Sequence, residues 1–292
     1  MKNYQSILPI VFIYIFSFTL SGCGGDDEGE IKDSGKTEKP IDSGGETVQS
    51  SCRLDSIFSH EDFDNVKIKY DGSHLISYAE YRDNGKIKDG KAYLLKWYAD
   101  HVEVWAAGVS RKWMDAIIGS NGYVKECHNS FYSDLNAEGS MRYQFEYDDE
   151  GHLIKYNRDN LSKHPNPDII EIRWENDNVV ETTLHFYKVN GSDRDGVWTQ
   201  NYTYTSLANP ANLLPYKHWI EGDTGSDFTE DELMPLYYAG LLGKGTKNLV
   251  KVTEFNGKVL SDYVYEQIDA YTMTRTYKYG TSTFTDYIFF TK

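Results

Sequence analysis

Cys23 is the residue in this sequence whose position most clearly indicates a chemical modification. It ends the stretch "LSGC", which directly follows an apolar run over residues 7–20. A basic residue such as Lys2, an apolar run of this length and small residues at the cleavage point are typical of a secretory signal peptide. The run is shorter than the roughly 20 apolar residues that a spanning helix needs. The sequence therefore predicts a leader over residues 1–22 that is removed before Cys23.

The four residues "LSGC" match the lipobox of bacterial lipoproteins. The match implies a diacylglyceryl thioether on the sulfur of Cys23 and an acylated amino group. At about 0.8 kcal/mol for each buried methylene, several acyl chains would hold the protein on a membrane. The alternative is a plain secretory signal with a cysteine near its cleavage point. The predicted location is the outer membrane, by a lipid anchor, on either its surface or its periplasmic side.

The stretch that follows, residues 23–51, is predicted to be a flexible acidic tether. It is rich in glycine, serine and charged residues and contains no aromatic residue. Such a segment buries too little apolar surface to offset the entropy lost on ordering. Its opening "CGGDDE" resembles the acidic export signal that follows the lipidated cysteine in surface-exposed lipoproteins of Bacteroidetes. The alternative is that these acids belong to a solvated linker.

Side chains that ligate metals or act as nucleophiles are present, but no recognisable motif brings them together. The 8 histidines are scattered along the chain and do not show the close spacings of zinc sites. Cys127 and His128 are adjacent, yet neighbouring residues of a strand point to opposite faces. The chain has no G-x-S-x-G, no phosphate-binding glycine loop and no H-E-x-x-H. No catalytic residue, metal or other cofactor is predicted.

Acidic residues give two weaker indications. "NGSDRDG" places Asp193 and Asp195 before Gly196, as in part of a calcium loop, but the glutamate that completes such a loop is missing. A hairpin turn explains this stretch more simply. A glycan hydrolase needs two carboxyl groups about 5 to 10 Å apart, and among 45 acidic residues no pair stands out. The candidates for such a pair are Glu80, Glu103, Glu146, Glu171 and Glu254.

After Cys23, two cysteines remain, Cys52 and Cys127. If the leader prediction holds, both pass through an oxidising compartment, where a disulfide can form. A Cys52–Cys127 bond would join the start of the domain to its middle. Two thiols that do not bond to each other are the alternative, and the sequence does not decide between the two.

The aromatic content is the unusual feature of the composition, with 24 tyrosines, 13 phenylalanines and 6 tryptophans. Aromatic side chains suit strands and fill barrel interiors, which accounts for most of them. Some could instead line a groove for a sugar or an acyl chain, because their faces stack and their N–H or O–H tips fix orientation. Trp105 and Trp113, which flank the irregular "AAGVSRK", are the predicted rim of such a groove.

The elements that would position these residues are strands. From Phe63 onward, short runs alternate apolar and polar residues and are separated by turn residues, which is the pattern of half-buried strands. In "MRYQFEYDDEGHLIKY", aromatic residues alternate with Arg142, Gln144 and Glu146, and residues 149–151 supply a turn into the next strand. This stretch is predicted to be a β-hairpin.

Similar hairpins are predicted with turns at residues 71–72, 176–178 and 256–257. Asn-Gly and Asp-Gly favour such turns because the central residues need positive φ. Consecutive hairpins form an all-β antiparallel meander. Closing the meander into a barrel or half-barrel hides the unpaired edges that promote aggregation, and a two-sheet sandwich is the alternative. Further strands are expected over residues 91–97, 102–105, 197–205, 271–279 and 283–290.

At most one or two short helices are expected. The clearest is "TEDELMPLYYAGLL", in which Thr229 and Glu232 form a capping box. Gly240 or Gly243 would end this helix. Pro235 lies inside the stretch, where it disfavours a long helix.

The strand faces predict that residues 52–292 form one barrel-like domain that does not span a membrane. A membrane-spanning barrel needs an outward apolar band on nearly every strand. Here the alternate faces of two strands are polar, so the barrel is predicted to face water and to be held by the lipid on Cys23. The polar residues in question are Arg142, Gln144, Glu146, Thr272, Thr274 and Thr276.

Several stretches together resemble a family of Bacteroides lipoproteins known only as a domain of unknown function with a porin-like fold. They are the repeated units "IKYDGSHL" and "FEYDDEGHL", the strand "NYTYTSLANPANL" and the stretch "LLGKGTKNLVKVTEF". The resemblance covers roughly residues 64–292 and departs where "SKHPNPD" and "DGVWTQ" extend the turns. It implies a many-stranded antiparallel barrel or half-barrel and lipid binding, and it implies no catalytic residues.

The formal net charge of −15 argues against a nucleic acid or an anionic lipid surface as partner. Together these features predict a membrane-anchored, non-enzymatic module that binds a hydrophobic or glycan ligand. The alternative is a structural or interaction protein of the outer-membrane surface without a small ligand, and a glycan hydrolase is the weakest of the three. The sequence does not indicate the oligomeric state.

Overall fold

The computed structural model describes residues 52–59, 65–82, 85–108, 111–129, 141–160, 167–187, 194–215, 233–279 and 281–291. The leader and the tether, over residues 1–51, lie outside this part of the chain, so both stay predictions. The described residues belong to one compact unit, Gln49–Lys292. The unit is all-β apart from one short helix in its described part, as the alternating pattern predicted.

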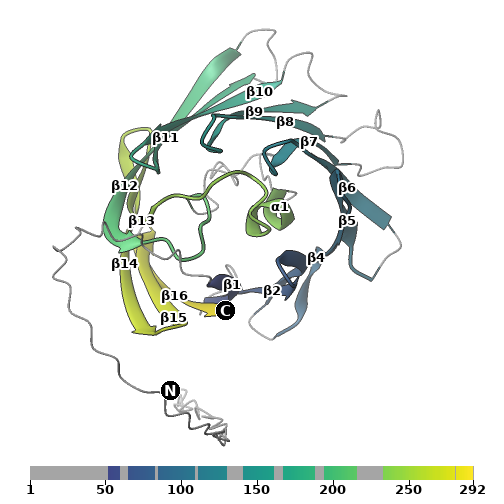
Figure 1. Ribbon diagram of the computed structural model, residues 1–292. Coiled ribbons are helices and arrows are strands. Elements are labelled where there is room, and N and C mark those ends of the chain that lie inside the picture. The colour runs from purple at the N-terminus through teal and green to yellow at the C-terminus, as the bar shows by residue number, and fades with distance from the viewer. Residues whose placement is uncertain are drawn as a thin grey trace, which may run out of the picture. The chain divides into compact units, whose positions relative to one another are not determined.

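Sixteen strands, counted over the described residues, follow one another in antiparallel order. The last strand also pairs with the first, from Arg53↔Thr291 to Ser59↔Asp286, so the sheet closes into a barrel (Figure 1). The closed meander confirms the barrel and rules out the two-sheet sandwich. The strands are β1 (Arg53–Ser59), β2 (Asn65–Asp71), β3 (His74–Tyr81), β4 (Ile87–Trp97), β5 (His101–Ala106), β6 (Arg111–Ile118), β7 (Val124–Asn129), β8 (Met141–Tyr147), β9 (Leu153–Asn160), β10 (Asp168–Glu175), β11 (Asn178–Tyr187), β12 (Arg194–Ala208), β13 (Asn248–Phe255), β14 (Lys258–Asp269), β15 (Thr272–Tyr279) and β16 (Ser282–Thr291).

The predicted tight turns are present. Asn256 and Gly257, between β13 and β14, have φ values of 47° and 76°. Asn176 and Asp177, between β10 and β11, have φ values of 52° and 60°. Two successive residues with positive φ make the turn whose twist matches that of the flanking strands. The turn residues therefore fix the register of these hairpins.

The repeated Tyr-Asp units share a tyrosine contact. The hydroxyl of Tyr70 in β2 donates to the carbonyl of Leu54 in β1, at 3.0 Å. The hydroxyl of Tyr147 in β8 donates to the carbonyl of Val124 in β7, at 2.7 Å. Burial raises the pKa of Tyr70 to about 12, so this hydroxyl stays a donor at neutral pH. Each tyrosine thus ties a strand to the strand before it.

The His-Leu pair that follows the turn makes the same contacts with a tryptophan in both units. His74 stacks on Trp97 with ring centroids 4.3 Å apart, and the Trp97 indole N–H donates to the carbonyl of Leu75 at 2.8 Å. His152 stacks on Trp174 at 4.2 Å, and that indole makes the equivalent bond to the main chain, also at 2.8 Å. The repeat in the sequence is therefore a repeated packing unit of the barrel wall.

In strands such as β8 and β15, apolar residues face inward and most polar residues face outward. In β8, Tyr143 and Phe145 are buried, whereas Gln144 and Glu146 are exposed. In β15, Met273 is buried while the threonines on either side of it are partly exposed. The predicted polar outer face of these strands is confirmed. A membrane-spanning barrel has the opposite arrangement, with an apolar outer band around a polar interior.

The described residues between β12 and β13 fill the interior. We call residues 209–215 and 233–247 the plug segment. Its helix α1 (Met234–Tyr238) is buried at every residue and lies inside the ring of strands (Figure 1). Tyr238 stacks on Tyr78 of the wall, with ring centroids 5.2 Å apart. A sixteen-stranded wall is too wide for its own side chains to fill, so the plug segment completes the core.

Helix α1 covers five residues of the described part of the chain, and its N-cap Leu233 makes no side-chain capping bond. Thr229 and Glu232, the predicted capping box, lie outside the described residues. Pro235 falls in the first turn, where its missing N–H has no helical partner to lose. The chain leaves the helix at Gly240, with φ of 69°, as predicted. No helix in the described ranges has the length and hydropathy needed to cross a bilayer.

Candidate functional site

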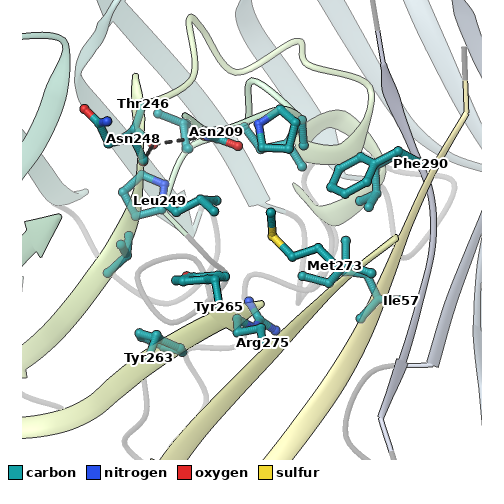
Figure 2. Close-up of a pocket in the computed structure, with 18 of the residues that line it drawn as sticks. Ile57, Asn209, Thr246, Asn248, Leu249, Tyr263, Tyr265, Met273, Arg275 and Phe290 are labelled. Carbon is teal, nitrogen blue, oxygen red and sulfur yellow. Dashed lines mark hydrogen bonds between the residues drawn. The ribbon is translucent and has the colours of Figure 1, made fainter. Parts of the chain in front are cut away.

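A hollow lies between the plug segment and the inner wall formed by β13 to β16 and β1. Its inner part has a volume of about 90 Å³ and its outer part a volume of about 310 Å³. Pro210, Met273 and Phe290 line both parts, so the two parts adjoin at these residues, and we refer to them together as the hollow. Figure 2 shows Met273 and Phe290 on one side of the inner part, with Arg275 lying closer to Tyr265.

The outer part lies at the rim of the barrel where β1 begins. Cys52, half-buried and directly before β1, lines it together with Ala270 from the turn after β14. Leu207, near the end of β12, completes this side. The chain therefore enters the barrel beside the mouth of the hollow.

The wall between the mouth and the inner end is apolar. Leu54 and Ile57 from β1, Met273 from β15 and Ile288 from β16 are each at most 9% exposed. Leu214 of the plug segment also lines this section. A surface of this kind favours contact with hydrocarbon over contact with water.

A buried ion pair forms the inner end. Arg275 and Asp286 face each other across β15 and β16 and are 5% and 1% exposed. Nε of Arg275 donates to Oδ2 of Asp286 at 2.9 Å, and Nη2 donates to the same oxygen. The rings of Tyr263 and Tyr277 lie 5.8 and 5.6 Å from the guanidinium carbon. The inner end is thus a compensated charge pair enclosed by aromatic rings.

Two phenols near this pair keep their protons. Burial raises the pKa of Tyr237 and of Tyr265, and the nearby charge of Arg275 lowers both by a smaller amount. The Tyr237 hydroxyl donates to the carbonyl of Leu214 at 3.0 Å, which joins α1 to the other arm of the plug segment. The inner end therefore presents neutral hydroxyl groups and a charge pair that sums to zero.

The structure does not bring Trp105 and Trp113 together in a groove. Trp105 faces outward from β5, where its indole N–H donates to Glu103 at 2.8 Å and the Lys96 ammonium lies 3.9 Å from its ring centroid. Trp113 packs inward against Tyr93, with ring centroids 5.8 Å apart. A register shift between β5 and β6 separates the two faces. The geometry gives no support to a shared rim.

No disulfide joins Cys52 and Cys127. Cys127 is fully buried in β7, and the strands β2 to β6 separate β7 from β1, which Cys52 precedes. A disulfide needs Cα atoms within about 7 Å. The structure has the alternative in which the two thiols do not bond to each other. His128, next to Cys127, faces outward, with Nε2 2.7 Å from a carboxylate oxygen of Glu126, as the strand geometry predicted.

The candidate carboxylates are spread over both faces of the wall. Glu80 is buried and accepts a hydrogen bond from the Tyr78 hydroxyl at 2.6 Å. Glu146 is on the outer face, 3.1 Å from Lys155. Asp193 of the calcium-loop fragment lies outside the described residues, while residues 195 and 196 form part of β12. These placements do not favour a hydrolase.

A cluster around His152, which the sequence analysis did not predict, fixes the plug segment to the rim. Nδ1 of His152 lies 2.9 Å from a carboxylate oxygen of Asp148, and Nε2 lies 3.3 Å from Oδ1 of Asp177. Lys244 of the plug segment donates to the same Asp177 oxygen at 2.9 Å. His152, Asp177 and Glu150 are of the types that bind metals, but the ammonium of Lys244 already compensates Asp177. The cluster is best described as a latch between two hairpin turns and the plug segment.

Acidification is expected to weaken this latch. The hydrogen bond from Lys244, with a smaller effect of His152, holds the pKa of Asp177 below its usual value. A carboxylate with a lower pKa in the folded state stabilises the fold above its unfolded pKa, and that contribution is lost as pH falls through the folded pKa. The urea midpoint should therefore drop below about pH 4, and Asp177→Asn should flatten this part of the profile.

The matched control for this prediction is Asp71→Asn, at the end of β2, where the side chain is exposed. This variant should keep the wild-type pH profile. An Asp177→Asn profile as steep as that of the wild type would show that the latch does not sense acid.

The sequence contains a signal for the buried ion pair of the hollow, in the parity of Arg275 and Asp286 along their strands. In "YTMTRTYKY", Arg275 has the same parity as Met273 and Tyr277, so it is a charge on the inward face. In "FTDYIFF", Asp286 has the same parity as Ile288. A charge of each sign on the apolar faces of adjacent strands indicates a buried ion pair, because a single buried charge is strongly unfavourable.

Residues 58–283 match a family model described as "Domain of unknown function (DUF4595) with porin-like fold". Among solved structures, the chain is similar to a porin-like protein from Bacteroides uniformis, with 13% identity and a TM-score of 0.56 over 84% of this chain and 98% of that one. It is also similar to a porin-like protein from Bacteroides vulgatus, with 13% identity and a TM-score of 0.49 over 82% and 98% of the two chains. No curated protein matches it. The family match covers most of the chain, and the likeness to the first structure shows the fold; the protein belongs to this family of porin-like domains of unknown function.

Proposed function

We propose that the protein is a lipid-anchored, non-enzymatic module whose water-facing barrel binds a hydrophobic ligand in the hollow beside the plug segment. The observation that carries this proposal is the apolar hollow, which runs from the rim toward the buried Arg275–Asp286 pair. Small-molecule sites are typically concave and mostly apolar, with a few placed polar groups. The lipobox at Cys23 supports the anchor.

The lining favours a hydrophobic ligand over a glycan. Sugars stack on exposed aromatic faces and need several polar partners, whereas Leu54, Ile57 and Met273 offer hydrocarbon. Trp105 and Trp113, the candidates for a sugar platform, face opposite sides of the wall. The buried acids support a non-enzymatic role, because Asp286 is bound by Arg275 and Glu80 by Tyr78.

Native mass spectrometry of residues 24–292, purified without detergent from cells grown in rich medium, tests this proposal. All sixteen strands of the described chain lie in the unit Gln49–Lys292, so the leader is not needed for the barrel. The expected spectrum contains the protein with an added mass of lipid size, and the same sample under denaturing conditions shows the bare polypeptide. A bare mass that persists after incubation with a bacterial lipid extract would contradict ligand binding.

The outer face of the wall favours a second candidate, a surface that contacts another protein. Phe58 in β1, Val264 in β14 and Ile268 in β14 are 45%, 61% and 54% exposed. Phe58 also meets the edge of Phe289, with ring centroids 5.8 Å apart. Exposed apolar side chains on an outer face are typical of contact sites, and here they lie on β14 and on the adjoining pair β1 and β16. A bare protein mass together with loss of a bound partner on Phe58→Ser would favour this candidate.

The lipid anchor gives a direct prediction. Replacing Cys23 with serine removes the sulfur that forms the thioether, so labelled palmitate should no longer enter the protein. The measurement is metabolic labelling of the full chain, followed by separation of membrane and aqueous fractions. Cys52→Ser is the matched control and should be labelled like the wild type. Equal labelling of the Cys23→Ser variant, or none in the wild type, would contradict the anchor.

A further inference from the structure

We propose that the hollow takes one unbranched acyl chain, tail first from the rim, and leaves the headgroup in solvent at the mouth. This inference rests on the proposed function and adds the class of ligand, the number of its chains and its orientation. It is carried by the size of the hollow, the order of its linings and the charge balance at its inner end.

The size of the hollow favours a single chain. The outer part is about 310 Å³ and the inner part about 90 Å³. Sites for small molecules range from about 300 to 1,000 Å³, so the two parts together lie near the lower end of this range. The outer part is lined by Cys52 at the rim, and the inner part by Arg275. An apolar space of this size fits one hydrocarbon chain better than two.

The charge balance fixes the orientation. Arg275 and Asp286 are both buried and compensate each other, so a charged headgroup beside them would be a third, uncompensated buried charge. The mouth is different, because Gln267 is exposed and Cys52 is half-buried there. A headgroup at the mouth keeps its water, while the tail replaces water along Leu54, Ile57 and Met273.

Met273 is the residue expected to set the fit. It is 4% exposed and lines both parts of the hollow, so a chain that passes from one part to the other must contact it. Its thioether is unbranched and adaptable, which suits a site that closes around a flexible chain. A larger side chain at this position would fill the passage.

The acyl chain has two possible sources with the same chemistry. One is a free amphiphile from the membrane. The other is the lipid predicted on Cys23 of the same molecule, since the chain enters the barrel beside the mouth at Cys52. A short peptide tether presents its own end at effective concentrations in the millimolar range. The experiment below distinguishes these sources.

The test uses the thiol of Cys52, at the mouth, as a reporter of occupancy. Residues 24–292 are titrated with saturated fatty acids and with lysophosphatidylcholines of about 8 to 16 carbons, below their micelle concentrations. Protection of Cys52 from a maleimide is read by intact mass, and Cys52→Ser reports background labelling. Affinity should rise about fourfold for each added methylene until the hollow is full, and the two headgroups should give the same series.

In Met273→Trp, the amphiphile affinity read from protection of Cys52 should fall by at least about tenfold, because the indole occupies the passage. Thr274→Trp, which adds an indole on the outer face of the same strand, is the control and should bind like the wild type. If Met273→Trp does not fold, Met273→Ala replaces it. The alanine variant deepens the hollow and should shift the best chain to a longer one.

The lipidated full chain identifies the source. Protection of Cys52 without an added noncovalent mass would assign the site to the Cys23 lipid. Protection with an added mass would assign it to a free amphiphile. Both results support the inference. Affinity that follows headgroup charge rather than chain length would overturn the inference and leave the proposed function standing. Failure of every amphiphile to bind or protect would overturn both.

Discussion

Replacing Arg275 with methionine is expected to destabilise the barrel by about 3 to 5 kcal/mol. The carboxylate of Asp286 is 1% exposed, and its Oδ2 accepts two hydrogen bonds from this arginine. Its Oδ1 has no hydrogen-bond partner within the described part of the chain. Removing the guanidinium therefore leaves a buried charge without a counter-ion. The measurement is the free energy of unfolding from urea denaturation, with the slope checked for two-state behaviour.

The double variant Arg275→Met with Asp286→Leu is the control. It removes both charges and leaves apolar side chains facing each other across β15 and β16. Replacing a whole buried pair by packed hydrophobic residues is often neutral or stabilising. The double variant should therefore regain most of the stability that the single variant loses. A single variant as stable as the wild type would show that the pair is solvated rather than buried.

Replacing Gly245 with alanine is expected to destabilise the barrel by about 3 kcal/mol or more. A Cβ at this position would lie 2.1 Å from both the carbonyl carbon and the oxygen of Asn212, and 2.5 Å from the nitrogen of Leu213. All three contacts are with main chain, so no side-chain rotation relieves them. The two arms of the plug segment would have to separate and lose the bond from the Thr246 N–H to the Leu213 carbonyl, which is 3.1 Å long.

Gly72→Ala is the control for this prediction. Gly72 lies in the turn between β2 and β3, where a Cβ meets no atom within 4 Å. Its φ of 55° is the remaining source of strain, worth about 1 to 2 kcal/mol for an alanine. Thermal unfolding followed by circular dichroism should rank the wild type first, Gly72→Ala second and Gly245→Ala last. Equal losses in the two variants would mean that the arms of the plug segment are not closely packed.

Most of the wall could be predicted from the sequence because its physics is local. Alternation in stretches such as "MRYQFEY" sets which residues face inward, and turns such as Asn256-Gly257 set the register of the next strand. Each hairpin needs only its own residues to be recognised. Sixteen strands in sequence order then close when the last pairs with the first. The repeated tyrosine and histidine contacts also join strands that lie close together in the sequence.

The candidate site could not be predicted in the same way because it forms between distant segments. Leu54, Leu214 and Met273 meet in the hollow only after the barrel has closed around the plug segment. A register shift, which alternation does not reveal, turns Trp105 and Trp113 to different faces. The short helix has a similar cause, because burial inside the barrel stabilises its five residues.

The wall combines a closed sixteen-stranded meander, counted over the described residues, with polar side chains on the outer face of strands such as β8. A sixteen-stranded membrane porin encloses an aqueous channel, whereas this barrel encloses Tyr143, Phe145 and an apolar plug segment. Its outer face carries Gln144 and Glu146 where a membrane barrel carries apolar residues. We infer that membrane attachment depends on the lipid predicted at Cys23 and not on the strands.

Sedimentation velocity of residues 24–292 in buffer without detergent tests whether the barrel faces water. We expect a discrete species of defined size whose circular dichroism spectrum is that of folded β structure. Adding a mild detergent should change neither the mass nor the spectrum. Aggregation in buffer, with folded protein recovered only inside detergent micelles, would contradict this expectation and indicate a barrel that is embedded in the membrane.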